Sequence, residues 1–223
     1  MFCWKIWRPT RLFQQNKTEV SLSKKNEERG FFAWNWKQTK GITDEDKATI
    51  ASLLKDNNYI ILTRHSNHLS TLMINLSDYF LLGKMGYWSH GLLNIEGDVS
   101  SKADYQLLES TANGVAIDDF DTVFGDCSAV AILKPVKMTA EEWSATLETA
   151  KADIGKSYDT LYNLAQTQKL SCVELVRNVL MAEPDYATDY ANLEAMCQAH
   201  QEITPQMFYG CPDFEVIYEV RVS

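Results

Sequence analysis

Hydrophobic and polar positions along the chain follow two periods, which predicts a mixture of strands and helices. Strand-length apolar runs and helically spaced apolar residues alternate, and the order is helices, strands, then helices with a late strand. This order favours an α+β domain with a mostly antiparallel sheet. Strands are expected at 59–63, 86–98, 105–110, 115–117, 129–133 and 214–220. Helices are expected at 43–54, 69–82, 139–154 and from 172 onward, with a helical or irregular piece at 189–200.

One of these helices begins with a cysteine. Ser171 is a suitable N-cap, and Glu174, three residues later, completes a capping box. Cys172 is then the first helical residue, where the free N–H groups and the helix dipole favour a thiolate. The thiolate is the nucleophilic form of cysteine. The alternative interpretation is a small buried residue at a helix start, a common place for an inert cysteine.

Charge divides the chain into two parts. The formal net charge is −9, but residues 1–40 hold nine Lys and Arg against three Asp and Glu, which leaves about −15 for the remainder. We therefore expect a basic, aromatic N-terminal arm at 1–40 and one globular domain at 41–223. An acidic domain excludes nucleic acid as the main partner. The arm either docks on a partner or membrane surface or folds back over the acidic domain, and the second alternative is favoured.

The five cysteines, an odd number without a CxxC pair, favour a reducing compartment over a disulfide framework. No apolar run reaches membrane-spanning length, and the first nine residues do not resemble a signal peptide. We therefore expect a cytoplasmic location. His65 and His68 are three residues apart, but without a nearby third ligand they are interpreted as polar loop residues. No metal or other cofactor is expected.

Two strand segments carry candidate partners for the Cys172 thiol. His90 lies in the expected strand 86–98, and Glu109 lies in the strand 105–110. A thiol nucleophile needs a base within hydrogen-bond reach, and the base needs an orienting group. Considered singly, His90 and Glu109 are also ordinary strand residues. Alternation along the strand assigns a face to each neighbour of His90: Ser89 and Gly91 opposite it, Trp88 and Leu92 beside it. Gly91 would permit close approach of another backbone.

Three motifs in this order, Trp88-Ser89-His90-Gly91, Leu108-Glu109-Ser110 and Ser171-Cys172-Val173-Glu174-Leu175-Val176, resemble a known family. The sequence is similar to the permuted branch of the papain-like NlpC/P60 superfamily, the YiiX/YebB-like cysteine hydrolases, over roughly residues 58–220. His90 precedes Cys172, which is the permuted order. The resemblance implies a circularly permuted papain-like fold and a thiol hydrolase that cleaves amides or esters.

The expected roles are Cys172 as nucleophile, His90 as base and Glu109 as orienting group, with Glu96 as a substitute for Glu109. The Cys172 N–H is the expected oxyanion donor. Trp88, Tyr158 and Tyr162 are the expected substrate-binding residues. We expect a neutral or cationic small-molecule, peptide or acylated substrate. The alternative is a non-catalytic binding or structural protein that retains the fold.

Overall fold

The computed structural model describes residues 40–55, 59–65, 69–95, 105–159, 164, 168–182 and 189–222. All of them belong to one compact unit, Lys37–Ser223. Apart from Lys40, the expected N-terminal arm lies outside the described residues, so its boundary and its docking remain predictions.

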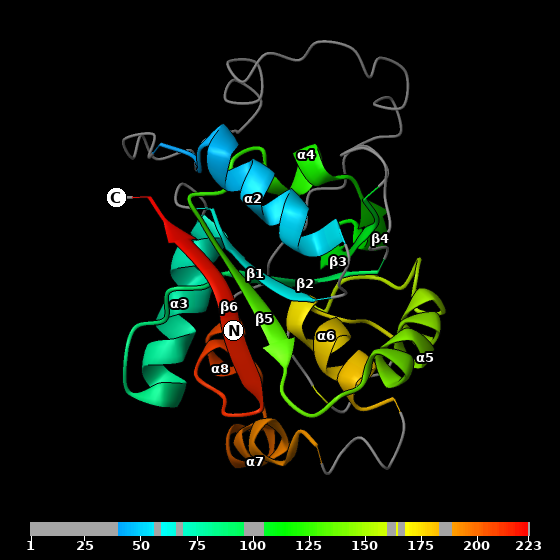
Figure 1. The fold of residues 1–223 in the computed structure, drawn as a ribbon. Coiled ribbons are helices and arrows are strands. Elements are labelled where there is room, and N and C mark those ends of the chain that lie inside the picture. The colour runs from blue at the N-terminus through cyan, green and yellow to red at the C-terminus, as the bar shows by residue number, and fades with distance from the viewer. Residues whose placement is uncertain are drawn as a thin grey trace. The chain divides into compact units, whose positions relative to one another are not determined.

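A six-stranded sheet forms the centre of this unit, in the order β4-β3-β2-β1-β5-β6 (Figure 1). Every neighbouring pair is antiparallel. The predicted α+β class with a mostly antiparallel sheet is therefore confirmed. The strands are β1 Ile60–Arg64, β2 His90–Asn94, β3 Leu107–Thr111, β4 Gly114–Asp118, β5 Ala129–Pro135 and β6 Phe214–Arg221.

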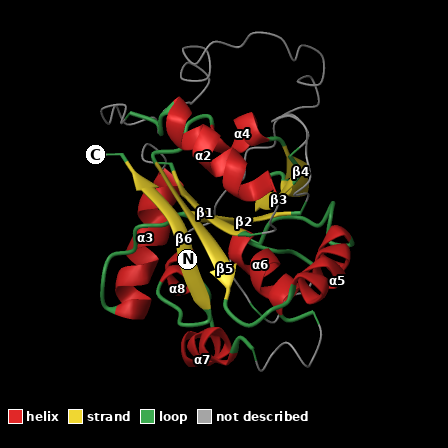
Figure 2. Cartoon of the chain, in the orientation of Figure 1, coloured by secondary structure: helices red, strands yellow, loops and turns green. Residues whose placement is uncertain are grey.

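Helices pack against both faces of the sheet, and strand alternation divides the core between them (Figure 2). On β1, Ile60 and Leu62 belong to the core that α5 to α8 share, whereas Ile61 belongs to the core formed with α2 and α4. Burying one such side chain contributes about 1.5–3 kcal/mol, so both layers are held firmly. The helices are α2 Asp44–Lys55, α3 Leu69–Leu82, α4 Phe120–Phe124, α5 Ala140–Lys151, α6 Cys172–Leu180, α7 Ala191–His200 and α8 Pro205–Tyr209.

Two short helices, α4 and α8, were not predicted. Each has five residues, too few to show a helical period. Local chemistry explains both: Asp119 caps α4 by accepting from the Thr122 N–H at 2.9 Å, and Pro205 begins α8. The expected strand 86–98 is also shorter than predicted, since only His90–Asn94 pairs within the sheet among its described residues.

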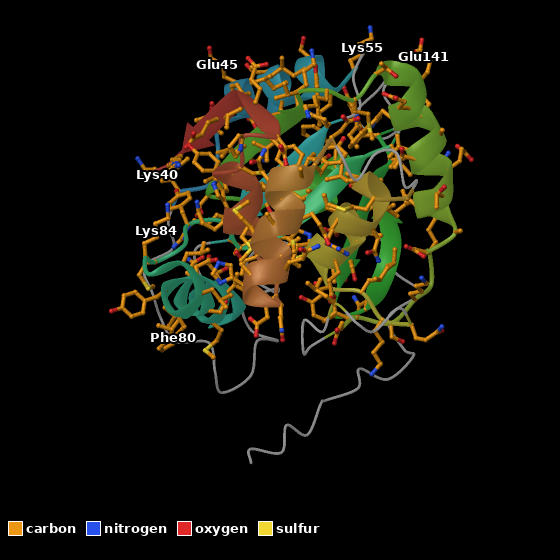
Figure 3. All side chains as sticks on the ribbon, turned by 90° about the horizontal axis from the view of Figure 1, so that it is seen from below. Lys40, Glu45, Lys55, Phe80, Lys84 and Glu141 are labelled. Atoms are coloured by element: carbon orange, nitrogen blue, oxygen red, sulfur yellow. The ribbon has the colours of Figure 1, made fainter. Side chains whose placement is uncertain are left out.

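The surface of α3 is apolar over part of its length. Phe80 is 77% exposed and Met73 is 51% exposed, and Figure 3 shows Phe80 and Lys84 at the periphery. Among the described helices, none combines the length and apolar character needed to span a bilayer. The buried side chains of this 14-residue helix include Thr71, Asn75 and Asp78, so several of its large apolar residues face outward.

Candidate active site

The N-terminus of α6 presents the candidate nucleophile. Ser171 has extended backbone angles, φ −71° and ψ 170°, and Cys172 is the first helical residue. The predicted capping box is confirmed: the Glu174 N–H donates to Ser171 Oγ at 3.3 Å, and the Ser171 N–H donates to Glu174 Oε2 at 2.6 Å. The first N–H groups of a helix have no acceptor within it, so the Cys172 sulfur lies at a positive helix end.

His90, the first residue of β2, contacts both of its expected partners. Its Nε2 lies 2.6 Å from Oε2 of Glu109, and the two side chains are only 16% and 9% exposed. Cys172 lies close enough to His90 for its charge and side-chain hydrogen bonding to raise the His90 pKa. The structure thus brings together three residues that come from β2, β3 and α6.

The charges in this group favour a protonated imidazole. Burial by itself lowers the pKa of His90, but the charge and hydrogen bond of Cys172, together with those of Glu109, raise it to about 10. A histidine with this pKa carries a proton throughout the neutral range. The arrangement is therefore an imidazolium held against a carboxylate with the Cys172 sulfur beside it, a setting suited to a cysteine nucleophile.

Besides His90, two other side chains, Asp118 and His65, lower the pKa of Glu109. Burial raises its pKa, but the hydrogen bond and charge of His90, a hydrogen bond with Asp118 and the charge of His65 together lower it. Asp118 stands opposite Leu107 in the β3–β4 register, so it shares the face that carries Glu109. Sequence analysis did not identify Asp118, although the hairpin pairing would have placed it there. Glu96, the substitute for Glu109, lies outside the described residues.

Gly91 lets α6 approach β2 beside the site. A Cβ at Gly91 would lie 3.3 Å from Cγ1 of Val173 and 3.6 Å from Cδ2 of Leu62. The predicted close neighbour is therefore a side chain of α6 rather than a backbone. In the register of β2 with β3, Leu93 stands opposite Leu108 and Asn94 opposite Leu107, away from His90. His90 therefore lies at the end of β2 close to the start of α6. This helix contacts both β2 and β3.

Trp88 does not line the site as expected. It is fully buried, and its ring packs on Tyr87 and Tyr209 with centroid distances of 5.1 and 5.5 Å. Trp88 precedes β2, so the strand alternation does not extend to it: Trp88 lies in the core beside α6, whereas Leu92 lies in the opposite core. Because no surface of Trp88 is accessible, we no longer assign it to substrate binding.

Of the two tyrosines expected at the site, the structure describes only Tyr158. Tyr158 is partly buried and follows Ser157, which forms an isolated bridge with Lys169, three residues before Cys172. This places Tyr158 on the segment that leads to α6, consistent with a place near the site. Tyr162 lies outside the described residues.

The other three described thiols have raised pKa values. Burial, as the largest cause, raises the pKa of Cys197 to about 11 and that of Cys211 to about 12. Burial likewise raises the pKa of the Cys127 thiol, whose Sγ lies 3.6 Å from Nε2 of His65. Such thiols are mostly protonated near neutral pH and react slowly.

His65 forms a second Cys–His–Asp grouping that the sequence did not reveal. Its Nδ1 lies 3.0 Å from Oδ1 of Asp126, on the ring side opposite Cys127. Cys127 is fully buried and donates to the Val123 carbonyl at 3.1 Å, so it is a structural thiol. His68 lies outside the described residues. Within the described part of the chain, no three His, Cys, Asp or Glu side chains are grouped to hold a metal.

Substituting Glu109 tests the electrostatic account of His90. In Glu109→Gln the carboxylate charge is lost, and the pKa of His90 should fall from about 10 by roughly 1–3 pH units. The measurement is an NMR titration of the His90 imidazole. Glu148→Gln is the matched control, because Glu148 is 73% exposed and pairs only locally with Lys151. An unchanged His90 titration in Glu109→Gln would contradict the assigned ion pair.

Comparison with known proteins gives the fold and the family. No curated protein matches the chain. Among solved structures, the chain is similar to the metalloprotein YiiX from Escherichia coli O157:H7, at 13% identity and a TM-score of 0.52, over 75% of this chain and 99% of that chain. At that identity the likeness shows the fold alone, a circularly permuted papain-like fold.

The family model described as the permuted papain-like amidases, YaeF/YiiX, C92, matches residues 60–218, from the start of β1 into β6. Because the match spans well over half of the sequence, this protein belongs to the permuted papain-like amidase family.

Proposed function

We propose that this protein is a thiol-dependent hydrolase, an amidase/peptidase or acyl hydrolase, that acts through an acyl-enzyme on Cys172. The observation that carries the proposal is the buried His90–Glu109 pair at 2.6 Å, which lies close enough to Cys172 for the thiol to raise the His90 pKa. A nucleophile, a base and a group that orients the base are what acyl transfer by a thiol requires. Family membership supports a cysteine hydrolase in general.

The proposed reaction has two halves. The Cys172 thiolate attacks the substrate carbonyl carbon, and the oxyanion accepts from the Cys172 N–H at the α6 terminus. As the C–N or C–O bond breaks, the His90 imidazolium gives its proton to the leaving group. In the second half, His90 takes a proton from water, which attacks the acyl-enzyme. The acid leaves, and the thiolate–imidazolium pair is restored while Glu109 holds the ring orientation throughout.

The substrate class is proposed from charge and from the aromatic segment before α6. The part of the chain after residue 40 carries about −15, which disfavours anionic polymers. We therefore propose a neutral or cationic small-molecule, peptide or acylated substrate, with Tyr158 and Tyr162 beside it.

The motif order also supports a place for the chain near the NlpC/P60 superfamily. The odd number of cysteines, five, supports a cytoplasmic location.

A metal has no role in the proposed reaction. The similar YiiX structure is described as a metalloprotein. In the described part of this chain, His65, Asp126 and Cys127 lie together, but Asp126 and Cys127 contact different ring nitrogens of His65. Those three side chains cannot converge on one ion, and no other such grouping occurs among the described residues. We derive no step through a metal.

One observation favours the alternative, a non-catalytic protein that retains the fold. Cys172 is only 1% exposed, so a substrate would need some opening of the surface around α6. The His90–Glu109 pair beside Cys172 argues for catalysis, because a purely structural thiol has no need of an imidazole held at 2.6 Å by a carboxylate. Trapping the acyl-enzyme distinguishes the two readings.

The trapping experiment uses a p-nitrophenyl acyl ester. The protein is mixed with the ester and quenched in acid, and the acylated peptide is identified by mass spectrometry. We expect the acyl group on the peptide that carries Cys172, and faster p-nitrophenol release than from Cys172→Ala. Acylation at another residue, or equal release by the variant, would refute the assignment of Cys172.

Deleting residues 1–40 tests the expected division of the chain. The arm carries none of the proposed catalytic groups, so acylation of Cys172 should stay within about twofold of the full chain. Location or solubility should change instead, because the arm is the basic part of the protein. A deletion variant that does not fold would show that the aromatic residues of the arm belong to the core.

A further inference from the structure

The peptide that precedes the candidate nucleophile is held at both of its ends. The Leu170 carbonyl accepts a hydrogen bond from Ser110 Oγ at 2.6 Å. On the same peptide, the Ser171 N–H donates to Glu174 Oε2 at 2.6 Å. Ser110 and Ser171 are fully buried, and Glu174 is 2% exposed. Both polar ends of the Leu170–Ser171 peptide are thus fixed without water.

The same segment is tied to the β3–β4 hairpin by its backbone. The Leu170 N–H donates to the Ser157 carbonyl at 3.0 Å, and the Val115 N–H of β4 donates to the Lys156 carbonyl at 2.9 Å. Gly114 permits this contact, because a Cβ there would lie 2.4 Å from the Lys156 oxygen and its φ is +99°. Ser110 adds the direct link between β3 and the start of α6.

Ser110 and Glu109 are neighbours on β3 and hold opposite sides of the site. Successive residues of a strand point to opposite faces. Glu109 binds Nε2 of His90, whereas Ser110 binds the peptide two residues before Cys172. One short stretch of β3 backbone therefore fixes the imidazole and the thiol relative to each other. A misplacement of about 1 Å between reacting groups can reduce a rate by about 100-fold.

We propose that Ser110 is a positioning residue that sets the N-terminus of α6, and with it Cys172, against the His90–Glu109 pair. The inference rests on the proposed function, in which Cys172 is the nucleophile. Ser110 does not touch the reacting atoms: it acts through the Leu170 carbonyl. Its hydroxyl therefore matters for how readily the sulfur pairs with His90, rather than for the chemistry itself.

The test compares Ser110→Ala, Ser110→Thr and the matched control Ser128→Ala. Ser128 is also a buried serine whose Oγ donates to a strand carbonyl, that of Arg64, at 3.1 Å. The readout is the rate of Cys172 alkylation by iodoacetamide between pH 5 and 9. Ser110→Ala should slow alkylation below pH 7 by on the order of tenfold and move the rise in rate to higher pH. Ser110→Thr, which keeps the hydroxyl, should restore the wild-type profile, and Ser128→Ala should leave it unchanged.

Two results would overturn the proposal while leaving Cys172 as the nucleophile: a wild-type pH profile in Ser110→Ala, or the same loss in Ser128→Ala. Backbone hydrogen exchange supplies a readout that needs no reactive thiol. Ser110→Ala should speed exchange in the first turn of α6 and leave α7 as it is. If the wild-type thiol resists alkylation, the proposed function fails, and unchanged exchange in α6 would then reject the role of Ser110 separately.

Discussion

Cys172→Ala is expected to abolish ester and amide hydrolysis, with a loss on the order of 10⁴-fold or more, as when the nucleophile of a catalytic triad is removed. The carbonyl then has no thiolate to attack it, although His90 and Glu109 remain in place. Steady-state release of p-nitrophenol measures the loss. Cys172 is 1% exposed and its replacement removes one sulfur atom, so the variant should remain folded.

Cys197→Ala is the matched control for that substitution. Cys197 is also 1% exposed, and burial raises its pKa to about 11, so its thiol has no part in the proposed chemistry. This variant should keep wild-type turnover even though its core loses a similar volume. Equal activity in wild type, Cys172→Ala and Cys197→Ala would show that the turnover comes from another site or from a contaminant.

His90→Ala is expected to lower kcat/KM by about 10²–10⁴-fold, the usual contribution of a general acid–base residue. Without the imidazolium, Cys172 loses its cationic partner, and the leaving group loses its proton donor. The loss should be larger for an anilide, whose amine must be protonated to leave, than for a p-nitrophenyl ester. A ratio of losses near one would contradict the role of His90 as the acid.

The pH dependence follows from the raised pKa of His90. Burial lowers this pKa, the charge of Cys172 and the contact with Glu109 outweigh burial, and the result is about 10. The imidazolium is therefore the main form below pH 10, and it loses its proton as pH rises through that value. Anilide cleavage by the wild type should fall over this range, whereas ester cleavage should not. A decline of anilide cleavage already near pH 7 would contradict the ion pair.

Local patterns predicted the elements of the site accurately. Ser171 and Glu174 lie three residues apart, so the capping box and the start of α6 could be read from the sequence alone. His90 and Glu109 were placed on adjacent strands by apolar runs and motif order, and the structure joins them at 2.6 Å. The cap and each strand are local patterns, whereas the pairing of His90 with Glu109 joins residues 19 positions apart and depended on the order of the motifs.

Contacts between distant elements could not be predicted in the same way. Trp88 appeared to share a face with His90, but β2 begins at His90 itself, and the side chain turns into the core between Tyr87 and Tyr209. Asp118 depends on the β3–β4 register, and the grouping of His65 with Cys127 depends on the neighbouring β1 and β5. A period along one segment contains no information about such pairings.

The most direct test of the central claim is the order in which the five cysteines react. A brief pulse of iodoacetamide at mildly acidic pH, followed by peptide mass spectrometry, labels the thiol with the largest thiolate fraction first. Cys172 beside His90 should be labelled first, ahead of Cys127, Cys197 and Cys211, whose pKa values burial raises. Labelling of Cys3, Cys127, Cys197 or Cys211 before Cys172 would contradict the assignment of Cys172 as the nucleophile.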